Sequence, residues 1–215
     1  MSAVAIRAHA PAFAPAPSWA SNRFRLRTDR GEVLPLHVGR WFGEPEPVEA
    51  EVLACALSPV LDVGCGPARH SLALKRRGAA ALGVDVAPSA VRIAEDRGVP
   101  VMHRSVFDPL PLEGQWGSAL LFDGNVGIGG DPAALLGRIR ALARAGGRAL
   151  VEVDPPGVPT QRLHVAIEID GEKGPWFAWA RVGADAVCCL AERTGFAMVE
   201  LWTGEGRWFA RLDAR

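Results

Sequence analysis

Hydrophobic and polar positions alternate in a regular way through the middle of the chain. Short apolar runs, typical of buried strands, are separated by segments in which apolar residues recur at helical spacing. The expected strands are residues 60–63, 80–86, 101–105, 118–123 and 148–153, and the expected helices are residues 69–77, 89–96 and 132–145. Asp131 is placed to cap the last of these helices, with Pro132 at its first position. This order predicts a parallel sheet covered by helices on both faces.

Strand pairs are expected on either side of this region. They are residues 23–28 with 32–38, 163–169 with 176–182, and 196–202 with 206–212. In the first pair, Gly31 closes the turn because it can take a positive φ. Further helices are expected at 48–57 and 184–193. Since strands joined by a short turn are antiparallel, the sheet should end on an antiparallel strand.

The chain is expected to form one domain behind a disordered tail. Residues 1–21 are rich in alanine and proline and show no periodicity, so they cannot bury enough surface to offset the entropy of ordering. With 215 residues, of which 49% are hydrophobic, the chain can build a core without disulfides or a structural metal. We expect a single domain over residues 22–215, with residues 22–58 as a lid-like N-terminal segment.

Charge and cysteine usage exclude several classes of protein. The 24 basic and 24 acidic residues cancel, which argues against nucleic acid or an anionic membrane as a partner. Cysteines occur at positions 55, 65, 188 and 189, a spacing that fits neither a zinc site nor a disulfide framework. No apolar run is long enough to cross a membrane, and prolines interrupt the only candidate targeting segment. A cytoplasmic protein without a metal is expected, and its oligomeric state stays open.

A glycine-rich turn follows the first strand of the expected parallel sheet. Residues 61–69 read Leu-Asp-Val-Gly-Cys-Gly-Pro-Ala-Arg, so Gly64 and Gly66 stand where the strand turns into a helix. Glycine lets the backbone approach a ligand closely, and both dinucleotides and S-adenosylmethionine bind at such turns. A dinucleotide site has a third glycine where this chain has Arg69. Asp62 would repel a pyrophosphate but favour the ammonium and sulfonium groups of S-adenosylmethionine.

A second acidic position supports the same ligand. Asp85 ends the next apolar strand, 21 residues after Gly64, at about the spacing that sets a carboxylate against ribose hydroxyls. The segment from Asp62 to Ala68, together with Asp85, resembles the first two motifs of class I S-adenosylmethionine-dependent methyltransferases. The resemblance covers residues 60–154 with decreasing sharpness.

This resemblance implies a fold and a cofactor site. The fold is a Rossmann-like, doubly wound α/β sheet of seven strands, mostly parallel with an antiparallel last strand, to which the N-terminal hairpin and the inserted antiparallel pair are added. The implied cofactor-binding residues are Asp62, Gly64, Cys65, Gly66, Asp85, Val86, Val106, Phe107, Asp123 and Asn125. The backbone of residues 64–66 would hold the methionine end, Val86 would pack on the adenine with Val106 and Phe107 on its other side, and the turn at 123–125 would face the methyl group.

The sequence departs from the family pattern at two positions. Ala68 stands where the family has the last glycine of its first motif, and Ser105 stands at the end of the third strand, where the family often has an acid. Asp108, three residues further on, is a candidate substitute for that acid, the alternative being a solvated loop position.

The acceptor side is less defined than the cofactor side. If the methyl acceptor is a hydroxyl, a base must take its proton, and His37, Asp123 and His164 are the candidates. The turn after the fourth strand reads Asp-Gly-Asn-Val and lacks the motif of enzymes that methylate planar amino groups, which disfavours adenine and glutamine. The sequence therefore predicts methyl transfer to a small molecule. The alternatives are a cofactor-binding protein of the same fold without methyl transfer, or a nicotinamide-dependent oxidoreductase.

Overall fold

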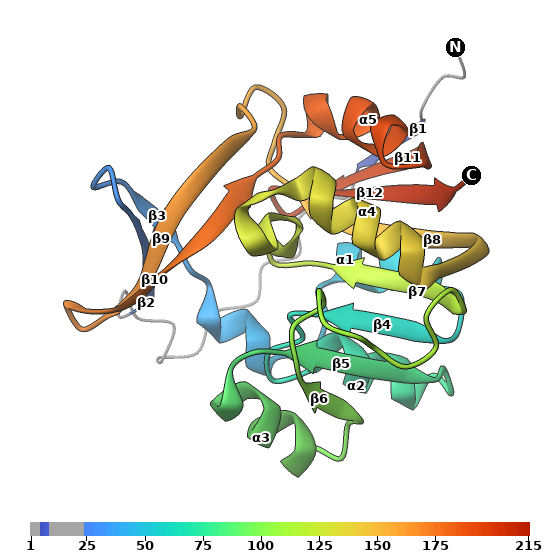
Figure 1. Ribbon diagram of the computed structural model, residues 1–215, viewed down its shortest axis with the longest axis horizontal. Coiled ribbons are helices and arrows are strands. Elements are labelled where there is room, and N and C mark those ends of the chain that lie inside the picture. The colour runs from blue at the N-terminus through green and yellow to red at the C-terminus, as the bar shows by residue number, and fades with distance from the viewer. Residues whose placement is uncertain (1–4, 9–23) are drawn as a thin grey trace.

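Two sheets of different size build the molecule (Figure 1). The computed structural model describes residues 5–8 and 24–215. The larger sheet has, in spatial order, β1 (Ala5–Ala8), β11 (Phe196–Gly204), β12 (Arg207–Ala214), β8 (Ala143–Val153), β7 (Trp116–Leu121), β4 (Val60–Val63), β5 (Ala81–Asp85) and β6 (Val101–His103). β12 runs antiparallel to both of its neighbours, whereas the other neighbouring strands are parallel. The predicted mostly parallel sheet with an antiparallel last strand is confirmed.

Helices cover both faces of the larger sheet because its strands are apolar on both faces. In β4, Leu61 and Val63 belong to one buried cluster and Val60 to another, as alternation along a strand requires. The first cluster includes residues of α4 (Pro132–Leu142) and α5 (Ala184–Arg193), and the second includes residues of α1 (Pro47–Ala54) and α2 (Arg69–Arg76). The remaining helices are α3 (Pro88–Asp96) and the short 3₁₀ segments η1 (Val38–Phe42) and η2 (Asn125–Gly130).

The beginning of α4 matches the sequence prediction, and its end does not. The Asp131 side chain accepts hydrogen bonds from the backbone N–H groups of Ala133 and Ala134 at 3.1 Å, so it caps the helix as expected. The helix stops at Leu142 instead of residue 145, because Ala143 already pairs with Trp116 of β7. Tertiary strand pairing outweighs the helix propensity of the alanines here.

The smaller sheet joins two segments that lie far apart in the sequence. It consists of β10 (Glu172–Arg181), β9 (Gln161–Ile169), β2 (Phe24–Thr28) and β3 (Val33–Pro35), all antiparallel. Both expected hairpins form, and the pairing of β2 with β9 unites them. Leu26, Leu163 and Val165 build an apolar cluster on one face of this sheet.

Part of the tail expected to be disordered forms a strand. Ala5–Ala8 make β1, which pairs in parallel with residues 200–203 of β11 and so extends the larger sheet by one strand beyond the seven expected. The free edge of β11 offers unpaired backbone groups, which explains why an aperiodic sequence can add a strand there. The rest of the expected tail, residues 1–4 and 9–21, lies outside the described part of the chain.

Gly127 in η2 allows the two sheets to meet. A Cβ atom at this position would lie 2.1 Å from the backbone oxygen of Ala180 in β10. Gly127→Ala is therefore expected to push η2 away from β10 and to lower the free energy of unfolding by about 2 kcal/mol or more, measured by urea denaturation. Gly137→Ala is the control, because a Cβ there, on α4, meets nothing within 4 Å. It should stabilise the protein by about 0.5 to 1 kcal/mol, and equal effects of the two changes would contradict this packing.

Candidate functional site

The glycine-rich turn after β4 has the geometry of a ligand cradle. Gly64 and Gly66 have φ values of +66° and +54°, which glycine adopts without strain. A Cβ atom on Gly66 would meet nothing within 4 Å, so the backbone there borders open space. Ala68 also has a positive φ, +61°, just before α2. That conformation explains why glycine suits this position in the family.

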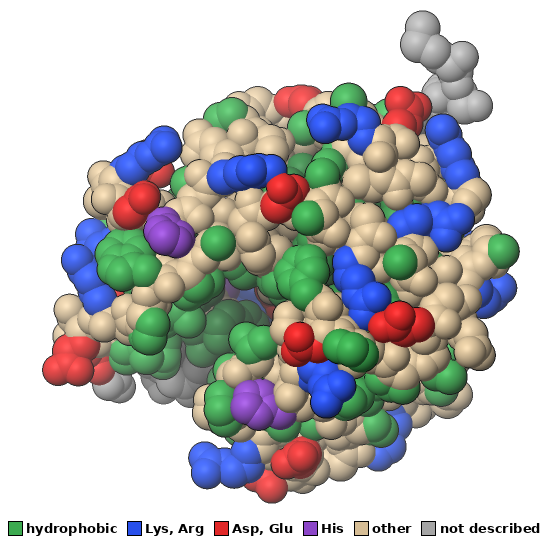
Figure 2. Space-filling model, viewed as in Figure 1, with side chains coloured by type: hydrophobic (Ala, Val, Ile, Leu, Met, Phe, Trp, Pro, Cys, Tyr) green, Lys and Arg blue, Asp and Glu red, His purple; other side chains and the backbone are tan. Residues whose placement is uncertain are grey.

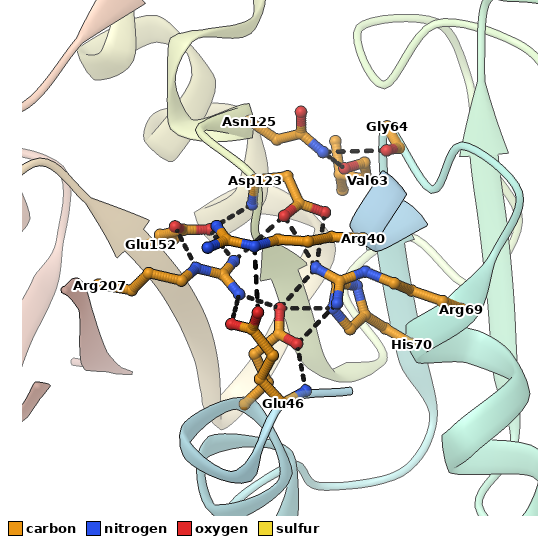
Figure 3. A network of polar contacts seen from close by, with 11 residues as sticks. Arg40, Glu46, Val63, Gly64, Arg69, His70, Asp123, Asn125, Glu152 and Arg207 are labelled. Atoms are coloured by element: carbon orange, nitrogen blue, oxygen red, sulfur yellow. Dashed lines mark hydrogen bonds and ion pairs between the residues drawn. The ribbon is translucent and has the colours of Figure 1, made fainter. Parts of the chain in front are cut away.

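The turn after β7 locks this cradle from the other side. The Nδ2 atom of Asn125 donates hydrogen bonds to the backbone oxygens of Val63, at 2.8 Å, and Gly64, at 2.9 Å (Figure 3). A Cβ on Gly64 would lie only 2.8 Å from the same nitrogen, so the close approach requires glycine. The structure thus brings together Gly64 and Asn125, two of the residues predicted to bind the cofactor.

Asp85 lies beside the cradle at the end of β5. Its carboxylate accepts hydrogen bonds from the backbone N–H groups of Gly66 and Ala87, each at 2.8 Å. Each oxygen keeps a second lone pair for a ligand hydroxyl. The next residue, Val86, is 66% exposed, and Phe107, whose ring lies against Gly129, is 43% exposed, although both are apolar. Val106 is buried.

Asp62 and Cys65 are more enclosed than the sequence suggested. The Asp62 carboxylate accepts hydrogen bonds from the backbone N–H and the hydroxyl of Ser71, at 3.2 and 2.7 Å, so a structural partner exists for this buried acid. Burial raises the pKa of Asp62. The Cys65 side chain packs toward Gly83, where a Cβ would lie 2.6 Å from its sulfur. The Cys65 side chain is buried, and burial raises the pKa of its thiol as well.

A network of charged side chains lies at the carboxyl ends of β7 and β8 (Figure 3). Its members are Arg40, Glu46, Glu49, Arg69, His70, Asp123, Glu152 and Arg207. Glu49 is at the centre and is fully buried. It accepts hydrogen bonds from Arg69 at 2.5 and 2.7 Å, while Arg207 lies 2.7 Å from its Oε1 atom. The local sequence pattern did not predict that these residues meet, and its one signal was an acid, Glu49, within the apolar face of the helix expected at 48–57.

Asp123 connects this network to the surface of the site. Its carboxylate accepts hydrogen bonds from Arg69, at 2.8 and 3.0 Å, and from Arg207 at 3.1 Å, and its backbone N–H donates to Glu152. Its φ is +55°, an uncommon value for a residue with a Cβ, and these contacts hold it there. Arg69 and His70, in the first turn of α2, are both turned toward Glu49.

A cavity of about 190 Å³ opens between the smaller sheet and the ends of β7 and β8. Leu26, Leu34, Leu36 and Trp179 are among the residues of the smaller sheet and its continuation that line it. The larger sheet contributes Asp123, Gly124, Glu152, Val153 and Asp154. In Figure 2 the molecule is hollowed between the two sheets, and hydrophobic side chains line the hollow. Neither Glu152 nor Asp154 was predicted as a site residue. Their position at the end of an apolar strand was the signal that could have indicated them.

The structure separates the three candidates for an acceptor-side base. Asp123 lines the cavity. His37 lies within electrostatic reach of the charged network: partial burial and the charges of Arg40 and Arg207 lower its pKa, whereas the charges of Glu46 and Asp123 raise it. His164 is exposed on β9, next to Leu163, which faces the same side as Trp179. Because side chains alternate along a strand, His164 points to the other face of the smaller sheet, away from the cavity.

Comparisons with known proteins support a cofactor site at the glycine-rich cradle. Residues 60–147 match the family model of a methyltransferase domain. A methyltransferase from Bacteroides fragilis, in complex with S-adenosyl-L-homocysteine, is 21% identical, with a TM-score of 0.73 over 92% of this chain and 90% of that chain. The 1,6-didemethyltoxoflavin-N1-methyltransferase of Burkholderia thailandensis, with bound 1,6-didemethyltoxoflavin and S-adenosylhomocysteine, is also 21% identical, with a TM-score of 0.61 over 83% of each chain. The chain is thus similar to a methyltransferase domain over residues 60–147, and it shares its fold with S-adenosylmethionine-dependent methyltransferases.

The residues around the cradle fit S-adenosylmethionine, the methyl donor that this similarity implies. Open space borders Gly66, and the apolar side chains of Val86, next to Asp85, and of Phe107 are exposed, as binding of an adenosine group requires. Among the described residues, no group of His, Cys, Asp or Glu side chains is arranged to hold a metal ion. Within that same part of the chain, no helix is long and apolar enough to span a membrane.

Proposed function

We propose that this enzyme methylates a small molecule that binds in the cavity between the two sheets. The observation that carries the proposal is the position of the turn at residues 123–125. Asp123 and Gly124 line the cavity, while Asn125 holds the glycine-rich cradle. A molecule in the cavity and a cofactor in the cradle would therefore meet at this turn.

The cofactor side of the proposal uses the residues predicted from the sequence. They are Asp62, Gly64, Cys65, Gly66, Asp85, Val86, Val106, Phe107, Asp123 and Asn125. Bound S-adenosylmethionine supplies a methyl group that is activated by its attachment to a positively charged sulfur. Asp85 would bind the ribose hydroxyls, and Val86 and Phe107 would hold the adenine. Asp62 would contribute indirectly, by holding α2 in place next to the cofactor, because its carboxylate already accepts hydrogen bonds from Ser71 of that helix.

The acceptor side needs mainly orientation and exclusion of water. Well-oriented reactants gain on the order of 7 to 11 kcal/mol in model reactions, so no elaborate catalytic group is required. Leu26, Leu34 and Trp179 provide an apolar wall against which an organic molecule can pack. Of the candidate bases predicted from the sequence, Asp123 lines the cavity and is the first candidate to take a proton from the acceptor, and His37 is the second.

The wider setting of the enzyme is proposed from the sequence and the fold. We assign residues 22–215 to one domain, in which the hairpin of β2 and β3 covers the acceptor as part of a lid. The N1-methyltransferase of Burkholderia thailandensis, whose structure holds a small molecule, supports a small-molecule acceptor. A cytoplasmic location is supported by the free thiols of Cys188 and Cys189, both exposed.

Turnover of labelled methyl donor tests the proposal. A cell extract is separated by size, and each fraction is incubated with the enzyme and the labelled donor. We expect S-adenosylhomocysteine to form with the small-molecule fraction, and the label to appear in a small product. Label found only in protein or nucleic acid would overturn the proposal.

The Trp179→Ala variant tests whether the acceptor binds in the cavity. Loss of this aromatic wall is expected to raise the KM for the acceptor by roughly 30-fold, since a buried tryptophan contact contributes about 2 kcal/mol or more. The dissociation constant for S-adenosylhomocysteine should stay unchanged. Trp176→Ala is the matched control, because Trp176 lies on the same strand but faces the other side of the smaller sheet. Equal effects of the two variants would place the acceptor elsewhere.

A further inference from the structure

Every charged side chain that lines the cavity in the described part of the chain has a partner of opposite charge. These side chains are Asp123, Glu152, Asp154 and Arg181. Arg181 donates hydrogen bonds to both oxygens of Asp154, at 2.5 and 3.0 Å. The buried Arg207 donates to Asp123 at 3.1 Å and to Glu152 at 2.6 and 2.8 Å. Because moving an ion out of water is costly where no unpaired counter-ion meets it, the pairing favours an uncharged methyl acceptor.

The Asp123 carboxylate keeps room for one hydrogen-bond donor. Its Oδ1 atom accepts from Arg69 and Arg207, whereas its Oδ2 atom accepts from Arg69 alone among the described residues, at 3.0 Å. Since a carboxylate oxygen has two acceptor sites, Oδ2 has one left. Asp123 also belongs to the turn between the cavity and the cofactor cradle. An uncharged acceptor that donates a hydrogen bond can therefore be held at this turn, next to the methyl donor.

The apolar walls of the cavity suit a flat carbon skeleton. The Trp179 ring lies against the same turn, since a Cβ on Gly124 would be 3.7 Å from its Cζ2 atom. Phe177 meets this ring edge to face, with 6.0 Å between the centroids and 88° between the planes, which restricts how the ring can turn. Leu26 and Leu34 add aliphatic surface. Because aromatic pairs gain more than the area they bury, an aromatic acceptor is favoured over an aliphatic one.

The titratable groups of the cavity are weak bases. Among the described residues that line it, these groups are three carboxylates and one guanidinium, with no histidine, lysine or cysteine. A carboxyl group ordinarily has a pKa of about 4 and a phenolic hydroxyl one of about 10, and the pKa of an aliphatic alcohol is far higher. Proton transfer to a base becomes easier as the gap between the two pKa values narrows. A carboxylate therefore assists methylation of a phenolic hydroxyl far better than that of an aliphatic one.

We infer that the methyl acceptor is an uncharged phenol, whose ring packs on Trp179 and whose hydroxyl donates a hydrogen bond to Asp123. This inference rests on the proposed function and names its substrate class. In the reaction, the hydroxyl proton passes to the Asp123 carboxylate and from there to water. An electron pair of the phenolic oxygen forms the new oxygen–carbon bond, while the electrons of the broken carbon–sulfur bond stay on sulfur.

Four probes of similar size test the inference. They are 4-methylphenol, 4-methylcyclohexanol, 4-methylbenzoate and 4-methylbenzylamine, titrated at pH 7.5 into the full chain loaded with S-adenosylhomocysteine and followed by ligand-detected NMR. This loaded state has no sulfonium charge, so the protein alone sets the preference. We expect 4-methylphenol to bind at least about tenfold more tightly than either ion and about threefold more tightly than the aliphatic alcohol. Binding of any other probe as tightly as 4-methylphenol would overturn the inference.

The product formed from the cell extract gives a second, independent test. Mass spectrometry of the labelled small product should identify an aryl methyl ether. A labelled small product of any other kind would overturn only the phenol. Failure of S-adenosylhomocysteine to bind, or label confined to protein or nucleic acid, would instead count against the proposed function itself.

Two tryptophan variants locate the aromatic contact. Trp179→Leu should remove the preference for 4-methylphenol over 4-methylcyclohexanol, because it replaces the ring with an aliphatic side chain. Trp176→Leu, on the other side of the smaller sheet, should keep that preference. Equal effects of the two variants would contradict the proposed position of the phenol. The comparison of probes on the unaltered protein remains decisive if Trp179→Leu does not fold.

Asp123→Asn separates binding of the phenol from removal of its proton. Asparagine accepts a hydrogen bond through its amide oxygen and tolerates the φ of +55° at this position, but it is not a base. The affinity for 4-methylphenol should therefore stay within about threefold, while methyl transfer to the acceptor from the extract should fall by about a hundredfold or more. Unchanged transfer would contradict the role of Asp123 and overturn the inference.

Discussion

Replacing Glu49 by glutamine is expected to lower the free energy of unfolding by about 3 to 5 kcal/mol, the usual cost of removing one partner from a buried ion pair. Glu49 is fully buried, and its two oxygens receive Arg69, Arg207 and His70 at 2.5 to 3.1 Å. The variant leaves two buried guanidinium groups with one negative charge fewer. Urea denaturation followed by circular dichroism measures the loss.

Glu44→Gln provides the control for this prediction. Glu44 also contacts an arginine, Arg76, at 2.6 Å, but both side chains are more than half exposed. An exposed pair contributes about 0 to 1 kcal/mol. A loss in Glu49→Gln as small as the loss in Glu44→Gln would show that the network does not stabilise the fold.

The ionisation of Glu49 predicts how the free energy of unfolding depends on pH. Burial alone would raise the pKa of Glu49, but the hydrogen bond with His70 and the charges of Arg207, His70 and Arg69 outweigh burial, so its pKa is lower in the folded protein than the ordinary 4.5. A carboxyl of this kind stabilises the fold above its unfolded pKa, and this contribution is lost as the pH falls. The difference in unfolding free energy between the unaltered protein and Glu49→Gln should therefore be constant near neutral pH and shrink below about pH 4.5. A difference that stays constant down to pH 3 would contradict this pKa.

The sequence predicts the larger sheet well because local signals define it. Each of these signals predicts the structure of its immediate neighbours in the chain. They are the apolar runs, the capping residue Asp131 and the glycines at 64 and 66. The helix expected at 184–193 has those bounds in the structure. The pairing of β2 with β9 could not be predicted, because it joins segments separated by more than a hundred residues and no local pattern sets its register.

The cofactor side and the acceptor side differ in the same way. Gly64, Gly66 and Asp85 lie in continuous motifs, so their approach to one another follows from the order of the strands. The charged network unites Glu49 with Arg207, which only the folded sheet brings together. The sequence also predicted the strand that contains His164. It could not predict on which side of the sheet this side chain lies relative to the cavity, because that depends on how the smaller sheet packs against the larger one.

Replacing Asp85 by alanine is expected to raise the dissociation constant of S-adenosylhomocysteine by about a hundredfold. The change removes the carboxylate that accepts the N–H groups of Gly66 and Ala87, and it removes the proposed partner of the ribose hydroxyls. Hydrogen bonds to a charged group contribute about 1.5 to 3 kcal/mol each, and a hundredfold change corresponds to about 2.8 kcal/mol. Isothermal titration calorimetry measures the effect.

Two further variants separate binding from folding in this experiment. Asp85→Asn keeps one oxygen as an acceptor, so its affinity should fall between those of the unaltered protein and Asp85→Ala. Asp96→Ala removes an exposed acid one helix away and should bind as the unaltered protein does. Because the N–H groups of Gly66 and Ala87 border the open cradle, water can replace the lost carboxylate, and Asp85→Ala should unfold within about 1 to 2 kcal/mol of the unaltered protein. A folded Asp85→Ala variant with unchanged affinity would remove Asp85 from the cofactor site, and the cradle alone would then have to account for binding.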